Sequence, residues 1–290
     1  MVRDFRSVSV SARVVTGSPD RSTIRTGLMI RIECAVAATR GARDYQEDCA
    51  AFWPDGGDPF FVQARSGNGS QCGGYAVLAD GMGGHTGGAL ASRIVCEQFL
   101  ASVTSLDGPV RQSLLEALDV ANAALAAKVE HSPVLSGMGS TLIGVAINDD
   151  GLAWVSVGDS PLYFFRRGEV AVLNEDHSLA PELDRMVAEG KLSAEEARRD
   201  SRRHMLRSAV TGDEIDMIDL PQSPVALEPG DFVVLASDGM VTLEKPEIAR
   251  IIQGYASDGA TAVAKALIRA VDAVREPHQD NATVLVVRVA

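Results

Sequence analysis

Acidic side chains occur in four short clusters that lie far apart along the chain, and these clusters are the part of the sequence best suited to chemistry. They are Gln46-Glu47-Asp48, Asp80-Gly81-Met82-Gly83-Gly84-His85, Ser237-Asp238-Gly239-Met240 and Asp280-Asn281-Ala282-Thr283. Each of the last three lies at the edge of a predicted strand. Strands that pack side by side would therefore bring these carboxylates together at one end of the fold.

Converging carboxylates repel one another, and without compensation some of them stay protonated. Divalent cations relieve this repulsion. Hard oxygen ligands, with no cysteine or histidine partner, favour Mg²⁺ or Mn²⁺ over Zn²⁺. The clusters therefore predict a hydrolytic metal site.

The composition excludes several classes of protein. The 290 residues carry a formal net charge of −12, whereas nucleic-acid binding needs basic patches, so we expect no nucleic-acid partner. No apolar run approaches the roughly 20 residues that cross a bilayer, so we expect no membrane span. The four cysteines (Cys34, Cys49, Cys72 and Cys96) show neither CxxC spacing nor a framework pattern, which indicates free thiols in a reducing cytoplasm.

The first 29 residues differ from the rest of the chain. They are rich in Arg, Ser and Thr and lack the apolar stretch of a secretory signal. An organelle-targeting peptide and a translation start at Met29 are both compatible with this composition. We expect residues 1–29 to form a disordered tail without a function, and residues 30–290 to form one domain, because no linker is visible after Ile30.

Hydrophobic periodicity predicts the elements that must position the acidic clusters. Strand patterns occur at 30–38, 49–53, 75–79, 141–147, 153–157, 162–165, 170–173, 215–220, 232–236 and 283–289. Helical spacing occurs at 89–103, 110–131, 180–203, 245–254 and 261–274. Residues 54–74, rich in Gly, Asp, Ser and Pro, read as a loop or hairpin.

The order of these elements predicts an α+β fold. Strands come mostly in consecutive hairpins and helices come in pairs, which is not the regular alternation of a βαβ protein. A four-layer αββα sandwich accounts for this order: two antiparallel sheets face each other, and each is flanked on the outside by a helix pair.

The glycine-rich segment after the strand at 75–79 superficially resembles a dinucleotide-binding turn. Its spacing does not fit, because Thr86 stands where the third glycine of GxGxxG is required. Its charge does not fit either, because Asp80 would face a pyrophosphate. A loop whose backbone passes close to a metal ion fits better, with the carbonyl of Gly81 free to coordinate.

Seven motifs, in order, carry a resemblance to a known family. They are RDYQED (43–48), ADGMGGH (79–85), GMGST (137–141), VGDS (157–160), EDHS (175–178), ASDG (236–239) and QDNAT (279–283). Together they resemble the bacterial metal-dependent protein serine/threonine phosphatases of type 2C, over nearly the whole of 30–290. Each motif is weak alone, whereas seven in register make a chance resemblance very improbable.

The resemblance implies a set of metal ligands. Asp80 resembles the carboxylate that bridges two Mn²⁺ or Mg²⁺ ions, with the carbonyl of Gly81 on one ion and Asp238 and Asp280 on the other. Asp159 resembles a ligand that forms a third, weaker site together with Asp238.

The same resemblance implies a mechanism. Glu47 and Asp48 would hold metal-bound waters. A bridging water made acidic by the two metals would attack phosphorus in line with the leaving group. No phosphoenzyme is implied.

Two further residues match family positions that contact the substrate. Arg43 resembles the arginine that grips the substrate phosphate, and its alternative role is an ion pair with a neighbouring carboxylate. His85 matches a histidine that protonates the leaving serine or threonine oxygen, and its alternative role is to cap the next helix.

Other motif residues favour structural roles. Asp176 and His177 read as residues that fix a turn, and Ser140 and Thr141 as the start of a strand near the site. The predicted helix at 180–203 falls where the family has a mobile flap.

The sequence departs from the family pattern at three positions. Gln46 stands where Asn is usual, Gly88 where Glu is frequent, and Pro161 where an arginine commonly follows GDS. Because proline restricts the residue before it, Pro161 could shift Asp159 and weaken the third metal site.

The predicted function is metal-dependent hydrolysis of phosphoserine and phosphothreonine in proteins, by a cytoplasmic monomer that acts against a serine/threonine protein kinase. Two alternatives remain open at this point: a catalytically silent phosphoprotein-binding or scaffolding relative, and a hydrolase of small phosphate esters.

Overall fold

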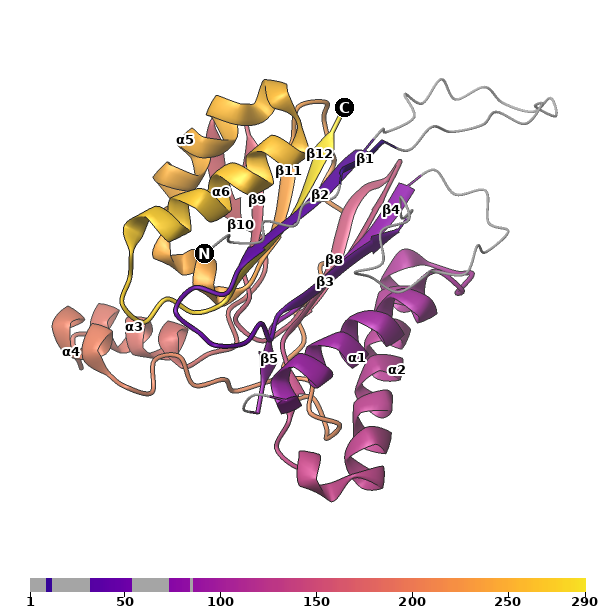
Figure 1. Ribbon diagram of the computed structural model, residues 1–290, viewed down its shortest axis with the longest axis vertical. Coiled ribbons are helices and arrows are strands. Elements are labelled where there is room, and N and C mark those ends of the chain that lie inside the picture. Colours follow the sequence, from indigo (N-terminus) through magenta and orange to yellow (C-terminus); the bar gives the residue numbers. More distant parts are fainter. Residues whose placement is uncertain (1–8, 12–31, 54–72, 84–85) are drawn as a thin grey trace.

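Figure 1 shows the chain as a computed structural model, which describes residues 9–11, 32–53, 73–83 and 86–290. Two antiparallel sheets lie face to face. The larger sheet has the order β1-β2-β12-β11-β9-β10. Its strands are β1 (Ser9–Ser11), β2 (Ile32–Thr39), β9 (Leu162–Arg166), β10 (Glu169–Val172), β11 (Phe232–Ala236) and β12 (Ala282–Val289).

The smaller sheet has the order β3-β4-β7-β8, and a short two-stranded ribbon, β5-β6, continues from it. The strands are β3 (Cys49–Trp53), β4 (Gly73–Ala79), β5 (Gly81–Met82), β6 (Gly139–Ser140), β7 (Leu142–Asn148) and β8 (Gly151–Val157). β7 is buried over almost its whole length, and β8 over all of it, because both of their faces are covered.

A helix pair covers the outer face of each sheet (Figure 1). α1 (Thr86–Val103) and α2 (Val110–His131) pack on the smaller sheet, and α5 (Lys245–Tyr255) and α6 (Ala260–Val274) pack on the larger one. The 3-10 turns are η1 (Pro133–Leu135), η2 (Asp238–Thr242) and η3 (Ala256–Asp258).

Three clusters of buried apolar side chains hold the four layers together. One lies between each helix pair and its sheet, and the third lies between the two sheets, where Val36, Leu78, Trp154 and Leu285 meet. This arrangement confirms the predicted αββα sandwich. Burial of apolar surface on both faces of both sheets is the main force that fixes the strand ends.

The segment predicted as one helix at 180–203 is instead two helices, α3 (Ala180–Ala188) and α4 (Ala194–Arg199). Gly190 adopts a left-handed φ of +70° after α3. A capping box follows, in which Ser193 and Glu196 bond each other's backbone and start α4. In Figure 1 both helices lie at the lower left, outside the four layers.

Two further predictions need correction. Residues 215–220 form no strand and make only an isolated bridge, between Asp219 and Ser156. Ser9–Ser11, within the segment predicted to be disordered, pair with β2 as strand β1. The rest of 1–29, and all of the predicted loop at 54–74 except Gly73 and Gly74, lie outside the described residues.

None of the helices in the described part of the chain combines the length and hydrophobicity that crossing a bilayer requires.

Candidate active site

An open cleft of about 810 Å³ lies where the ends of the two sheets meet, and aspartates that adjoin four strands line it. Asp80 joins β4 to β5, Asp159 follows β8, Asp238 opens η2 directly after β11, and Asp280 precedes β12. The fold therefore brings together the carboxylates that the sequence placed at strand edges. We call Asp80, Asp238 and Asp280, with the loop 40–48, the floor of the cleft.

The backbone of Asp80 is fixed on both sides by the start of β7. Its amide donates to Thr141 Oγ1 (2.9 Å), and its carbonyl accepts from the Thr141 amide (2.9 Å) and from Ser140 Oγ (2.8 Å). Thr141 Oγ1 also contacts Ser160 Oγ at 2.8 Å. Ser140 and Thr141 thus have the structural role that the sequence favoured, and they hold the turn that carries Asp80.

Two glycines allow the loops of the floor to touch. A Cβ on Gly81 would lie 2.1 Å from the carbonyl oxygen of Gly88, and a Cβ on Gly88 would lie 2.4 Å from Glu47 Oε1. Gly88 departs from the family pattern. Because Gly88 has no side chain, the Glu47 carboxylate occupies the space where a side chain would lie.

Asp48 lies beneath the cleft. Its Oδ2 accepts a hydrogen bond from Ser237 Oγ (2.8 Å), and Ser237 Oγ in turn accepts from the Thr283 amide (2.9 Å). Asp48 Oδ1 is buried and, within the described residues, has no hydrogen-bond partner. A buried carboxylate oxygen in this position is costly unless a water or cation satisfies it.

Asn281 ties the loop 40–48 to the start of β12. Its Oδ1 accepts from the Glu47 amide (2.8 Å), and its Nδ2 donates to the carbonyls of Tyr45 (2.8 Å) and Arg40 (3.1 Å). The Gln279 carbonyl accepts from the amide of Ala42 at 2.8 Å. Sequence reasoning gave neither amide residue a role, although both lie inside the QDNAT motif.

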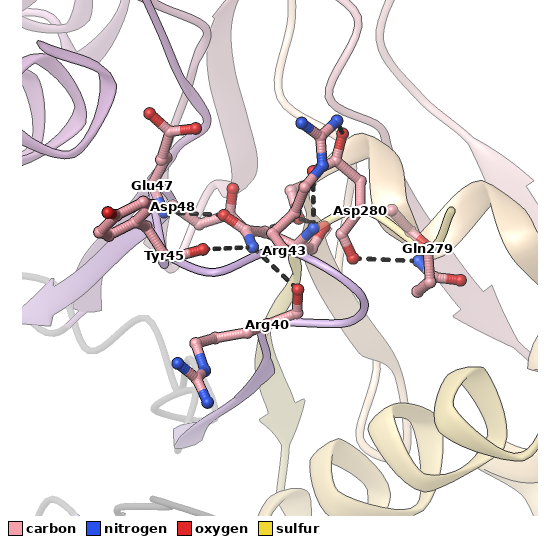
Figure 2. A network of polar contacts seen from close by, with 10 residues as sticks. Arg40, Arg43, Tyr45, Glu47, Asp48, Gln279 and Asp280 are labelled. Carbon is pink, nitrogen blue, oxygen red and sulfur yellow. Dashed lines mark hydrogen bonds and ion pairs between the residues drawn. The ribbon is translucent and has the colours of Figure 1, made fainter. Parts of the chain in front are cut away.

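Arg43 reaches Asp280 across the edge of the cleft. Figure 2 shows its guanidinium beside the Asp280 carboxylate, with Nη2 at 2.5 Å from Oδ2. This is the ion-pair alternative for Arg43. The side chain nevertheless remains 55% exposed and lines the cleft, so most of its N–H groups face solvent.

Burial and mutual repulsion raise the pKa of four aspartates in and beneath the cleft. The Asp80 pKa rises well above its usual value, first through burial and then through the charges of Asp48, Asp238 and other cleft carboxylates. Burial raises the pKa of Asp48 and of Asp159 to about 7 each, and hydrogen bonds to Thr283 and Ser237 oppose the rise at Asp48. Burial, with Asp280 second, raises the pKa of Asp238.

These observations fit a hard divalent cation. The donors are carboxylate and carbonyl oxygens, one buried oxygen is unsatisfied, and the crowded negative charge needs compensation. No three His, Cys, Asp or Glu side chains within the described residues already surround one point as a cage. The carboxylates face a shared space from separate loops, which suits ions that retain several waters.

Residues 61–271 match the family model described as protein phosphatase 2C. The chain belongs to the protein phosphatase 2C family. The serine/threonine protein phosphatase PstP of Mycobacterium tuberculosis is 36% identical over 169 residues, which cover 57% of this chain and 31% of PstP. The chain thus spans about a third of the length of that relative.

Solved structures of phosphatases have the same architecture. A serine/threonine phosphatase from S. agalactiae superposes with a TM-score of 0.72 at 26% identity, over 89% of this chain and 100% of that one. The catalytic domain of PstP in complex with two manganese ions gives a TM-score of 0.67 at 28% identity, over 90% and 99% of the two chains.

The turn before α3 is fixed by Asp176 and His177, as predicted. His177 is buried, and its Nδ1 accepts from the Gly158 amide at 3.2 Å. Asp176 Oδ1 accepts from the Ser178 amide at 2.7 Å. The bond between His177 and the Gly158 amide fixes the backbone next to Asp159. Asp159 lines the cleft despite the neighbouring Pro161.

We call residues 174–216 the outer wall of the cleft, because the part of this segment between His204 and Asp216 lines it. His204 lines the cleft there and partly opposes the rise that burial causes in the pKa of Asp238. Arg207 and three acidic residues at 213, 214 and 216 line it further out. No sequence pattern distinguished His204, which stands just after the predicted helix. The other candidate histidine, His85, lies outside the described residues.

Proposed function

We propose that this chain is a metal-dependent phosphatase that hydrolyses phosphoserine and phosphothreonine in proteins. The observation that carries the proposal is the gathering of Asp80, Asp238 and Asp280, from three separate turns, in an open cleft beside a half-exposed arginine. Family membership supports it, since the relatives named above are serine/threonine phosphatases.

Two Mn²⁺ or Mg²⁺ ions are the proposed cofactors. Asp80 would contact both ions. The Gly81 carbonyl would contact one of them, and Asp238 and Asp280 would contact the other. Asp159 and Asp238 would hold a third ion. When bound, the ions supply a water acidic enough to attack phosphorus and positive charge for the phosphoryl oxygens. Glu47 and Asp48 would accept hydrogen bonds from waters around the ions.

The remaining steps belong to side chains of the protein. Arg43 would leave Asp280 and donate two hydrogen bonds to the substrate phosphate, which a planar guanidinium does well. Its exposure leaves it free to rotate toward a phosphate in the cleft. His85 would give a proton to the leaving serine or threonine oxygen.

The proposed partners and setting follow the same reasoning. Substrates are phosphoproteins, and a serine/threonine kinase supplies them. We propose a monomer in the cytoplasm, where Cys34, Cys49 and Cys96 stay reduced; all three are free thiols in the structure. We also propose that residues 30–290 form the phosphatase domain.

The decisive experiment measures hydrolysis of a phosphothreonine peptide with Mn²⁺, with Mg²⁺ and with excess EDTA. We expect turnover that needs metal and stops with the chelator. An Asp238→Asn protein serves as the inactive control. If the protein melts at a higher temperature with Mn²⁺ but releases no phosphate, the phosphatase proposal fails and a binding or scaffolding role replaces it.

A further inference from the structure

A second hollow, of about 630 Å³, adjoins the cleft and shares Asp159 with it. It lies where the end of β10 and the segment after it meet η2 and the start of α5. Asp159 forms part of the wall of both spaces, so the two spaces lie next to each other. We call it the side groove.

Most of the surface that lines the side groove is apolar. Tyr163 and Leu243 form its buried part, at 4% and 3% exposure. Val172 and Val241 stand at its edge, and Val241 is 60% exposed. An aliphatic side chain that is so exposed beside an apolar hollow gains stability when another apolar group covers it.

One polar side chain, that of Tyr163, lies inside the side groove, and the residue is almost fully buried. Burial raises the pKa of the Tyr163 hydroxyl to about 12, so it keeps its proton and can donate. Buried tyrosine hydroxyls usually find a partner, and a peptide carbonyl in the groove would provide one.

The charges around the side groove are mostly negative. Glu175, Asp176 and Glu244 line it against a single cation, Lys245. A basic side chain next to the buried apolar one would therefore be attracted, and an acidic one repelled.

We propose that the side groove binds the polypeptide of the substrate itself, taking an apolar side chain that lies near the phosphorylated residue and is flanked by a basic one. This inference rests on the proposed function, because it assigns the groove to the same substrate. Three observations carry it: the wall that the groove and the cleft share at Asp159, the exposed Val241 beside an apolar hollow that contains the Tyr163 side chain, and the excess of acidic residues.

The test uses phosphothreonine peptides of glycine and serine in which one leucine is moved a single position at a time. We expect one position to raise kcat/KM about tenfold, the effect of partly burying a leucine. Placing an arginine next to that leucine should raise it further, and placing a glutamate there should lower it.

The variant Val172→Ser with Val241→Ser should reduce the leucine gain to below about threefold. The matched control is Val134→Ser, since Val134 is also an exposed valine in a 3-10 turn but lines neither space. Glu175→Gln with Glu244→Gln should remove the arginine gain and keep the leucine gain. All of these proteins should hydrolyse p-nitrophenyl phosphate, which is too small to reach the groove, at the wild-type rate.

The outcomes separate the two proposals. If p-nitrophenyl phosphate and the peptides are all left intact, the proposed function is wrong, and the groove inference is wrong with it. If both are hydrolysed but leucine has no preferred position, or the serine variants keep the full preference, the groove inference alone is overturned.

Discussion

The floor of the cleft and its outer wall differ in how deeply their supporting residues are buried. Each carboxylate of the floor adjoins a strand whose side chains belong to a buried cluster, and backbone hydrogen bonds hold the turns around it. The outer wall contains α3 and α4, which bury little: Leu183 and Ala197 are their only buried residues among those described.

Two arginine–aspartate pairs show the same contrast. Arg166 bonds both oxygens of Asp231, which is 3% exposed at the start of β11. Arg203 bonds both oxygens of Asp184 in α3, which is 60% exposed. The geometry is alike, but the surroundings differ. The core therefore supports the pair at Asp231, whereas the outer wall is held by weak surface pairs.

The largest effect should come from Asp238→Asn, which removes a charge from the floor. We expect phosphopeptide turnover to fall by at least about a thousandfold, because this carboxylate serves two proposed metal positions. The folded structure should survive, since the amide is the same size. Turnover is measured with Mn²⁺, and folding by circular dichroism; activity near the wild-type level would remove Asp238 from the site.

Arg166→Ala should be the most damaging change among the ion pairs. It leaves the buried Asp231 with only the Glu228 amide as a hydrogen-bond donor, and we expect the free energy of unfolding to fall by about 3 kcal/mol. Urea denaturation measures this. Arg167→Gln provides the control, because Arg167 bonds Glu228 at the surface and is 79% exposed. Equal losses for the two variants would mean that burial is not what gives the Arg166 pair its strength.

The metal-free protein should become less stable as pH rises from about 4 to 7. Asp48 and Asp159 have pKa values of about 7 in the folded state, against the usual 3.8, so the folded state binds more protons than the unfolded one across this interval. Their favourable contribution is complete below the unfolded pKa and is lost as pH passes the folded pKa.

Thermal melting in EDTA measures this dependence, and we expect a melting temperature several degrees lower at pH 7.5 than at pH 5. Asp48→Asn should flatten the curve, because it removes one of the shifted groups. Saturating Mn²⁺ should also flatten or reverse it. A melting temperature that rises with pH in EDTA would contradict the crowding of charge in the floor.

Arg43→Ala should raise KM for a phosphopeptide about tenfold and change kcat less, if its contact with phosphate is equal in the ground and transition states. Arg43→Lys should recover only part of the loss, because an ammonium cannot bond two oxygens in one plane. Initial-rate kinetics measure both constants. An unchanged kcat/KM would leave Arg43 with its structural pairing to Asp280 alone.

The smallest effect on global stability should come from Arg203→Ala in the outer wall, below about 1 kcal/mol. Local opening should increase instead, since α3 would lose its link to the turn after α4. Limited proteolysis across 180–207, compared with wild type, detects this opening. Faster cleavage without a change in urea midpoint is the expected pair of results, and a shifted midpoint would show that the wall shares the stability of the core.

The strongly patterned elements could be predicted from the sequence. β3, α2 and β11 begin and end at the predicted residues, because their apolar side chains face a core cluster along the whole element. The convergence of Asp80, Asp238 and Asp280 could be predicted as well, since each lies next to a predicted strand, whereas Asp159 was indicated only by the family resemblance.

Weak patterns failed where tertiary contacts decide. Residues 215–220 alternate in polarity, but the Asp219 carboxylate accepts a hydrogen bond from Trp154 Nε1 at 2.8 Å. The segment makes an isolated bridge and no β-ladder. The helix predicted at 180–203 is interrupted between Ala188 and Ala194, where Gly190 and the capping box of Ser193 mark the break. His204 and Asn281 interact with residues that are far away in the sequence, and no local pattern predicts such interactions.

The position of β12 also sets when the site can form. This strand is the last in order along the chain, yet it lies between β2 and β11 and carries Asp280 and Asn281, whose contacts reach back by up to 241 residues. Contacts between residues so far apart in the sequence form late and slowly, because the chain between them must first lose conformational entropy. In a polypeptide that is still emerging from the ribosome, the loop 40–48 therefore lacks its contacts with Asn281, and the acidic cluster at 280–283 is not yet in place. The cleft is complete only when the whole sandwich has formed.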